Sequence, residues 1–112
     1  TRVPGLLAYS AAAALAEVRQ LAAPATLGVT TLSGVEDHAS LAPLALQLLE
    51  RSAALTDELA AIEALHAVDL LGVNGVRPAG AGTGELFGRV EETVESGIPA
   101  AELVPVVVAS LA

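Results

Sequence analysis

The chain has 112 residues, no cysteine and a formal net charge of −8, and 54% of its residues are hydrophobic. This length allows one domain at most, so residues 1–112 are treated as a single helical segment. The acidic balance argues against nucleic acid and anionic membranes as partners, because both need a cationic surface. Without cysteine there is no disulfide framework and no thiolate zinc site; nothing requires an oxidising compartment, and we expect a cytoplasmic protein.

The mean hydropathy of +0.65 is high for a chain of this size. A small domain buries only about 60–70% of the surface that its unfolded chain exposes. The longest apolar run is far shorter than the roughly 20 residues that span a bilayer, and the start of the sequence lacks the charged region of a signal peptide. We therefore expect much of the apolar surface to meet another protein chain.

Residues 6–22 are predicted to form the first helix. Alanine and leucine dominate this segment, and its apolar residues recur at three- and four-residue spacing. Pro24 ends the helix, because proline has no amide hydrogen and restricts the residue before it.

Residues 23–40 are predicted to form a long polar loop. Loops of this length are usually functional or disordered. Near its end, Glu36, Asp37 and His38 place three ionisable groups side by side. They have two interpretations: carboxylates that cap the next helix, or a carboxylate that handles an amine or a proton.

The second helix is predicted from about residue 39 to residue 71, with Asp37 or Ser40 as its cap. Pro43 is tolerable only in the first turn. At about 1.5 Å per residue, 33 residues give a helix about 50 Å long. The remaining chain is too short to cover that length, so we expect this helix to be shared in a larger bundle.

The rest of the chain is predicted to form shorter helices. Gly72 closes the second helix, residues 72–84 form a loop, and Thr83 caps a helix over 84–96 that carries a solvated face of Glu91, Glu92 and Glu95. The tail after Pro99 is only weakly helical in pattern, because Pro105 and three valines interrupt it. The predicted fold class is all-α, with long antiparallel helices of a central bundle and shorter C-terminal helices.

Two features resemble binding sites without meeting the chemical requirements. The glycine-rich residues 80–84 have no predicted strand before them and no Lys-Ser/Thr after them, so they indicate a helix entry rather than a phosphate loop. His66 lies near Glu63 and Asp69 in sequence, but two ligands make no metal site, and a packed or partly solvated histidine is favoured. No metal site is expected.

Between residues 7 and 71 the chain resembles the aromatic amino acid ammonia-lyases, and histidine ammonia-lyase most closely. The matching residues, in order, are Tyr9 with Ala11 to Leu15, Leu21-Ala22-Ala23-Pro24-Ala25-Thr26, Thr31, Glu36-Asp37-His38-Ala39-Ser40, Ile62-Glu63-Ala64-Leu65 and Ala67-Val68-Asp69-Leu70. Gly82-Thr83-Gly84 also resembles the turn before the family's last helix.

This resemblance implies a helical homotetramer whose active sites draw on several subunits and eliminate ammonia from an aromatic L-amino acid. It gives Glu36 the role of contacting the substrate and assisting its chemistry, and a glutamate there leans towards histidine as the substrate. Val35 departs from the family, which has an amide residue before the glutamate, and the loop is about one residue shorter.

The resemblance also implies methylidene-imidazolone as the electrophile, formed from an internal Ala-Ser-Gly. The chain contains no such triplet, so it provides no cofactor of its own and is not expected to be catalytic alone. In the first hypothesis, the chain is the C-terminal portion of an ammonia-lyase-like enzyme, either as a fragment or as the small part of a split enzyme. Its expected partners are helical chains, either further copies or a complementary N-terminal part, and a small amino acid substrate.

Two alternatives remain. In the first, the helices serve as a non-catalytic oligomerisation or interaction module, and Glu36 only caps a helix. In the second, the chain is a general alanine-rich helical bundle with no link to the family.

Overall fold

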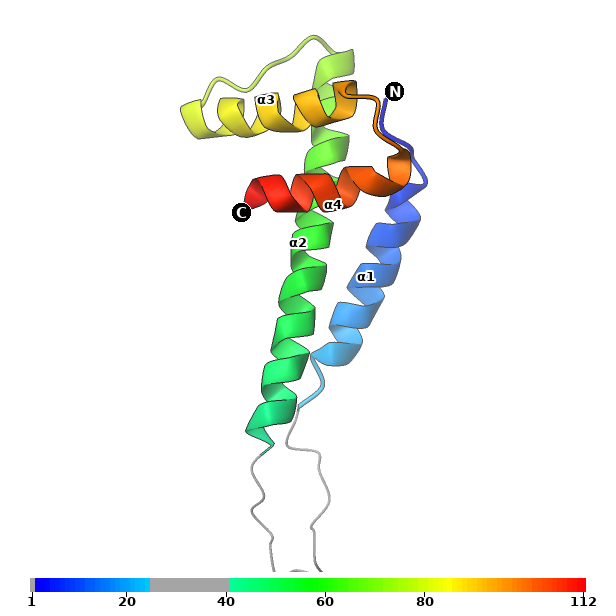
Figure 1. Ribbon diagram of the computed structural model, residues 1–112, viewed down its shortest axis with the longest axis vertical. Helices are drawn as coiled ribbons and strands as arrows, with labels where there is room; N and C mark the ends of the chain where they lie inside the picture. The colour runs from blue at the N-terminus through cyan, green and yellow to red at the C-terminus, as the bar shows by residue number, and fades with distance from the viewer. Residues whose placement is uncertain (1, 25–40) are drawn as a thin grey trace, which may run out of the picture.

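A computed structural model describes residues 2–24 and 41–112 of the chain. The described residues form four helices and no strand, so the all-α prediction is confirmed: α1 (Leu7–Leu21), α2 (Ala42–Val73), α3 (Ala81–Glu95) and α4 (Ala100–Leu111) (Figure 1). None of these helices combines the length and the apolarity that crossing a membrane requires.

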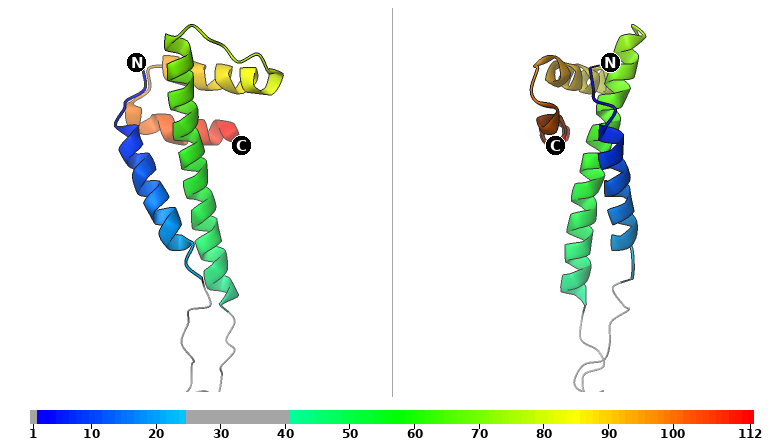
Figure 2. Two further views of the ribbon diagram at one scale, coloured as in Figure 1. Left: turned by 180° about the vertical axis from the view of Figure 1, so that it is seen from behind. Right: turned by 90° about the vertical axis from the view of Figure 1, so that its right-hand side faces the viewer.

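The helices α1 and α2 run side by side in opposite directions (Figures 1 and 2). Their bounds differ by one to three residues from the predicted 6–22 and 39–71, which is the usual uncertainty for helix ends. Pro43 lies in the first turn of α2, as predicted, where its missing amide hydrogen costs no internal bond. The long second helix is therefore continuous over 32 residues.

The two shorter helices, α3 and α4, cross the half of α2 that contains its C-terminal end, and both lie on the same side of it (Figures 1 and 2). Gly75 and Gly97 have φ values of 65° and 72°, which few residues other than glycine adopt without strain. These glycines follow α2 and α3 and let the chain turn back at each point.

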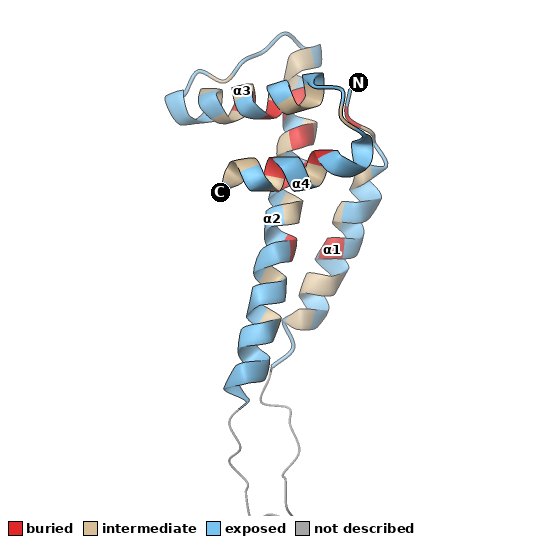
Figure 3. Cartoon of the chain, in the orientation of Figure 1, coloured by how far each residue is buried: buried red, intermediate tan, exposed pale blue. Residues whose placement is uncertain are grey.

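The hydrophobic core lies where these helices meet. Its buried residues come from the N-terminal segment, α2, α3 and α4, and are Val3, Ala61, Leu65, Val68, Phe87, Val90, Leu103 and Val107. Figure 3 shows that the buried residues of α2 gather in the half near α3 and α4, whereas the half nearest residue 42 is largely exposed.

The N-terminal segment before α1 packs on this core and bonds to two of its helices. The backbone N–H of Arg2 donates to Oδ1 of Asp69 at 2.7 Å, and Asp69 is buried. The Arg2 guanidinium pairs with Glu95 of α3 at 2.9 Å. Val3 follows with its side chain in the core. Two residues therefore join the first segment of the chain to both α2 and α3.

One prediction about the later helices is wrong, and the weakly patterned tail is more regular than its sequence indicates. The helix α3 begins at Ala81 with Gly80 as its cap residue, and the Thr83 hydroxyl donates to the Gly80 carbonyl from inside the first turn. Thr83 is therefore not the cap of a helix that begins at residue 84. The tail forms a regular helix although Pro105 lies inside it. Leu103 and Val107 are buried there, and this packing outweighs the loss of one amide donor.

Candidate functional site

The predicted site residue Glu36 lies outside the described residues, together with Asp37 and His38. The same holds for the predicted cap of the second helix, whether Asp37 or Ser40. The structure therefore leaves both interpretations of the three ionisable groups open. It does describe the helices that precede and follow this stretch.

The ends of α1 and α2 that flank residues 25–40 lie at the same end of the helix pair (Figure 1). The helix α1 finishes at Leu21, where the N–H of Ala22 donates to the Val18 carbonyl at 3.1 Å. The helix α2 starts at Ala42 with Leu41 as its cap residue. Both helices are regular up to these residues. The pair formed by α1 and α2, called the frame below, is therefore defined on either side of residues 25–40 in the sequence.

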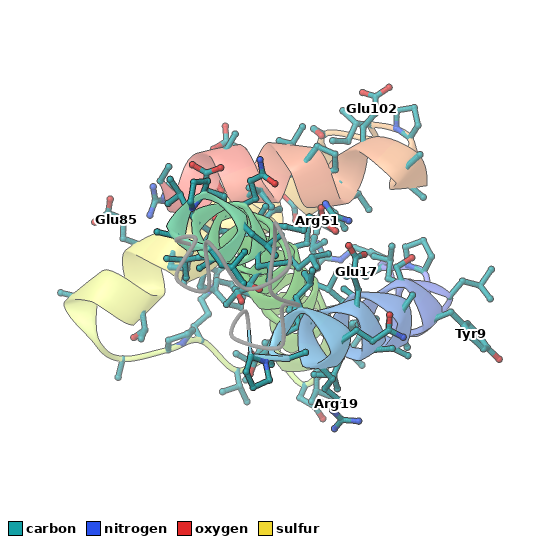
Figure 4. All side chains as sticks on the ribbon, turned by 90° about the horizontal axis from the view of Figure 1, so that it is seen from below. Tyr9, Glu17, Arg19, Arg51, Glu85 and Glu102 are labelled. Carbon is teal, nitrogen blue, oxygen red and sulfur yellow. The ribbon has the colours of Figure 1, made fainter. Side chains whose placement is uncertain are left out.

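An ion pair between Glu17 and Arg51 joins the two helices of this frame. The Arg51 Nε donates to Glu17 Oε1 at 2.7 Å and its Nη2 donates to Oε2 at 3.0 Å. Figure 4 shows the two side chains pointing toward each other. The hydrogen bonds from Arg51 lower the pKa of Glu17, and those to Glu17 raise the pKa of Arg51. This two-point contact links α1 to α2 on the surface of the helix pair.

A shallow hollow of about 290 Å³ lies between the C-terminal end of α1 and the N-terminal half of α2. Its lining is mostly apolar and comprises Leu21, Ala22, Ala23, Ala45, Leu48, Leu49 and Ser52. Among these, only Ser52 has a polar side chain, and its hydroxyl already donates to the Leu48 carbonyl at 2.8 Å. The hollow offers contact for an apolar group but no ionisable group for chemistry.

His66 is partly buried in α2, in keeping with the packed or partly solvated histidine that was favoured. Its Nε2 atom is buried and has no hydrogen-bond partner among the described residues. Glu63 is exposed, and Asp69 accepts a hydrogen bond from the Arg2 amide. Across residues 2–24 and 41–112, no group of three or more potential metal ligands comes together.

The acidic face of α3 is less uniform than predicted. Glu92 and Glu95 are exposed, but only 16% of the Glu91 side chain is accessible, and it pairs with Arg77 at 2.7 Å. The Arg77 guanidinium also lies 5.1 Å from the centre of the Phe87 ring. Glu91 is therefore part of the packing between α3 and the loop before it, and the prediction of a simple solvated face is wrong for this residue.

The glycine-rich residues 80–84 form the start of α3, as the helix-entry interpretation predicts. The N–H of Gly84 donates to the Gly80 carbonyl at 2.7 Å. The segment that precedes them is loop, so the strand required before a phosphate loop is missing from this part of the described chain.

Two contacts were missed by sequence reasoning. The Glu17–Arg51 pair joins residues 34 positions apart, and the Arg2–Asp69 bond joins residues 67 positions apart. Neither spacing carries a local signal. For Asp69 a weak signal exists, since a carboxylate flanked by apolar residues in a helix needs a partner when it is buried.

Comparison with known protein families matches residues 5–92 to the family described as aromatic amino acid lyase. The curated proteins searched contain no match to the chain. The solved structures searched contain none either. The family match extends over most of the chain, from the segment before α1 to within α3. It excludes the interpretation of a general alanine-rich bundle without relatives, and the chain belongs to the aromatic amino acid lyase family.

Proposed function

We propose that this chain is the C-terminal helical portion of an ammonia-lyase that removes ammonia from an aromatic L-amino acid, with histidine favoured. In this proposal it is a fragment or the small part of a split enzyme, acts in the cytoplasm, and is not catalytic alone. The observation that carries the proposal is the family match over residues 5–92, which includes the whole stretch from Glu36 to Ser40.

Glu36 is the residue to which we assign a catalytic role. A carboxylate beside the amino group of a substrate stabilises its positive charge or exchanges a proton with it. The helices described above support this assignment, because the C-terminal end of α1 and the N-terminal end of α2 lie at the same end of the pair. The Glu17–Arg51 contact links these two helices.

The electrophile of the reaction has to come from elsewhere. Methylidene-imidazolone forms from an Ala-Ser-Gly triplet, and these 112 residues contain none. The residues present therefore do not fit the group, and we assign none of them to its formation. In the proposal, a complementary segment or chain supplies the triplet, and the active site is completed by assembly.

The test is reconstitution. The 112-residue chain is mixed with a lyase part that carries Ala-Ser-Gly, and ammonia release from histidine, phenylalanine and tyrosine is measured. We expect release only in the mixture, with histidine fastest, and a fall in kcat of about 100-fold or more for Glu36→Gln, the scale of a lost acid–base group. The matched control is Glu50→Gln, which makes the same change at an exposed residue of α2. We expect this variant to keep full activity.

A well-folded assembled mixture without ammonia release would contradict the proposal. So would a working mixture in which Glu36→Gln and Glu50→Gln behave alike. A faster reaction with phenylalanine or tyrosine would contradict only the preference for histidine, and the rest of the proposal would stand.

A non-catalytic oligomerisation module is the second candidate, and the exposed leucines of α2 favour it. Leu44, Leu46 and Leu49 are 44%, 55% and 65% exposed on the half of α2 beside which, among the described helices, α1 runs. Exposed apolar surface of this kind marks an association site. In this candidate the chain forms a stable oligomer, and Glu36 affects only folding.

Sedimentation of the isolated chain separates this candidate from a monomer. We expect an oligomer that Leu44→Glu with Leu49→Glu dissociates, while Leu70→Glu, at an equally exposed leucine of the opposite half of α2, leaves it intact. A monomer at all concentrations would remove the module hypothesis.

A further inference from the structure

A groove of about 600 Å³ lies between α1, α2 and α4. Its apolar lining comes from all three helices and includes Leu7, Ala54, Ile62, Ala101, Val104 and Val108. Ile62 is buried, whereas Ala54 and Ala101 are exposed. The groove is therefore a mainly apolar surface that includes small, exposed side chains.

Two carboxylates line the same groove. Asp57 is exposed and Glu58 is partly exposed, and both contribute to the lining through α2. Neither makes an ion pair within the described residues. Glu58 lies close enough to Arg51 to raise its pKa, but the guanidinium of Arg51 binds Glu17 through two hydrogen bonds. The negative charge at the groove is therefore not neutralised by a hydrogen-bonded cation.

Most arginines of the described residues already bond to other groups. It contains five arginines and no lysine. Arg2, Arg51 and Arg77 are held by glutamates, and Arg89 donates to the Ser110 carbonyl at 2.8 Å. Arg19 remains, and it points away from α4 (Figure 4). A second copy of the chain would thus bring mainly further negative charge to the groove.

The form of the groove indicates a helix as its occupant. Every residue that lines it belongs to a helix, and those of α4 and several of those from α2 are spaced three and four positions apart, the spacing through which helices pack on one another. An amphipathic helix places its own apolar residues at the same spacing and binds such a groove through its apolar face. The exposed alanines of the lining allow its backbone to come close.

We propose that this groove binds an amphipathic helix of another protein segment that carries lysine or arginine beside its apolar face, with Asp57 and Glu58 as the residues that select the basic side chains. The apolar lining provides the contact area, and the carboxylates distinguish a basic helix from an acidic one. This inference does not depend on ammonia elimination or on Glu36.

The test uses the full 112-residue chain and two fluorescein-labelled helical peptides of about 18 residues, or five turns. Both peptides carry leucines along one face; one has lysines at the two edges of that face and the other has glutamates. Binding is measured by fluorescence anisotropy at physiological ionic strength. We expect the lysine peptide to bind about tenfold or more tightly than the glutamate peptide.

Charge-reversal variants show whether the preference for the lysine peptide comes from the groove carboxylates or from the overall charge of −8. Asp57→Lys with Glu58→Lys is expected to reverse the preference between the peptides. Glu85→Lys with Glu92→Lys changes the net charge equally on exposed residues of α3, outside the groove lining, and is expected to retain the preference. Circular dichroism confirms that each variant is helical.

A substitution that fills the groove provides a second test. Ala54→Arg is expected to weaken the binding of the lysine peptide by about tenfold or more. The arginine blocks the apolar contact and also adds positive charge. Three results would overturn the proposal: absence of binding to the wild-type chain, equal binding of the two peptides, or equal effects of the α2 and α3 reversals. Self-association of the wild-type chain that Ala54→Arg abolishes would also overturn it, in favour of a second copy.

Discussion

The two halves of α2 have similar compositions but different surroundings. Leucine and alanine occur throughout both. All the buried residues of the helix, namely Leu55, Ala61, Ile62, Leu65, Val68 and Asp69, lie from residue 55 onward, and none lies between residues 42 and 54. The difference arises because α3, α4 and the N-terminal segment pack on the second half, while among the described helices it is α1 that runs beside the first (Figure 3).

This comparison shows that hydrophobicity and burial are separate properties of a helix in this family member. The second half gains stability from burial within the chain, at about 25 cal/mol for each Å² of apolar surface removed from water. The first half packs against α1 but leaves side chains such as Leu46 and Leu49 mostly in solvent, and these gain stability of this kind only when something covers them. The four predictions that follow perturb this contrast, from the largest expected effect to the smallest.

The largest effect is expected from Leu65→Ala. Leu65 is fully buried at the centre of the core, so the substitution removes buried contacts and leaves a cavity. We expect a loss of about 2–5 kcal/mol in the free energy of unfolding. Chemical denaturation monitored by circular dichroism measures it.

Leu49→Ala is the matched control for this prediction. Leu49 is 65% exposed in the first half of α2, so its truncation should change the free energy of unfolding of the monomeric chain by no more than about 0.5 kcal/mol. Equal losses for the two variants would mean that the halves of α2 do not differ as the structure shows.

The next effect is expected from Asp69→Ala. This change leaves the Arg2 backbone N–H without its acceptor in a part-buried position, at a cost of about 1–3 kcal/mol. Asp69→Asn keeps an oxygen that can accept the bond and should restore most of the stability. If the alanine and asparagine variants unfold at the same denaturant concentration, the bond to Arg2 does not hold the N-terminal segment on the core.

His66→Leu should stabilise the chain. The substitution replaces a buried nitrogen atom that has no hydrogen-bond partner in the described residues with apolar groups, and leucine is also the better helix former. We expect a gain of about 1 kcal/mol, measured as a higher melting temperature. A lower melting temperature would show that His66 Nε2 has a polar partner in solution.

The smallest effect is the pH dependence of the Glu17–Arg51 pair. Since the pKa of Glu17 is lowered in the folded chain, the pair contributes stability at pH values above that of a free glutamate, about 4.3, and loses it as the pH falls through the lowered pKa. Glu17→Gln should therefore reduce stability slightly at pH 7 and have no effect at low pH. Melting curves at both pH values check this, and a larger effect in acid would contradict it.

The sequence was sufficient to predict the number and approximate limits of the first two helices. The signals used were the three- and four-residue spacing of apolar residues and the prolines Pro24 and Pro43. These signals are local, and local signals determine where helices begin and end. The glycine-rich entry to α3 was found in the same way, although its first residue was misplaced because Thr83 is a good cap residue in isolation. The helical tail was underestimated because Leu103 and Val107 are stabilised by packing against distant residues.

The candidate site could be predicted only in part. Glu36 was identified by resemblance to a family, and the family match confirms that family without testing the residue. The groove that Asp57 and Glu58 line could not be found from sequence, because it depends on how α4 crosses α2. Crossing geometry results from packing between helices and leaves no spacing pattern in the chain.

The N-terminal segment has a consequence for the order in which the chain folds. Arg2 and Val3 are synthesised before the other described residues, but their partners include Asp69, Glu95 and the core around Val107. During translation they cannot make all these contacts until residue 107 has left the ribosome, whereas α1 and α2 can meet much earlier. Contacts between such distant positions form slowly, and until they form the apolar side chains of the core are exposed. A ribosome-bound chain that ends before residue 107 should therefore be a better substrate for chaperones than the released protein.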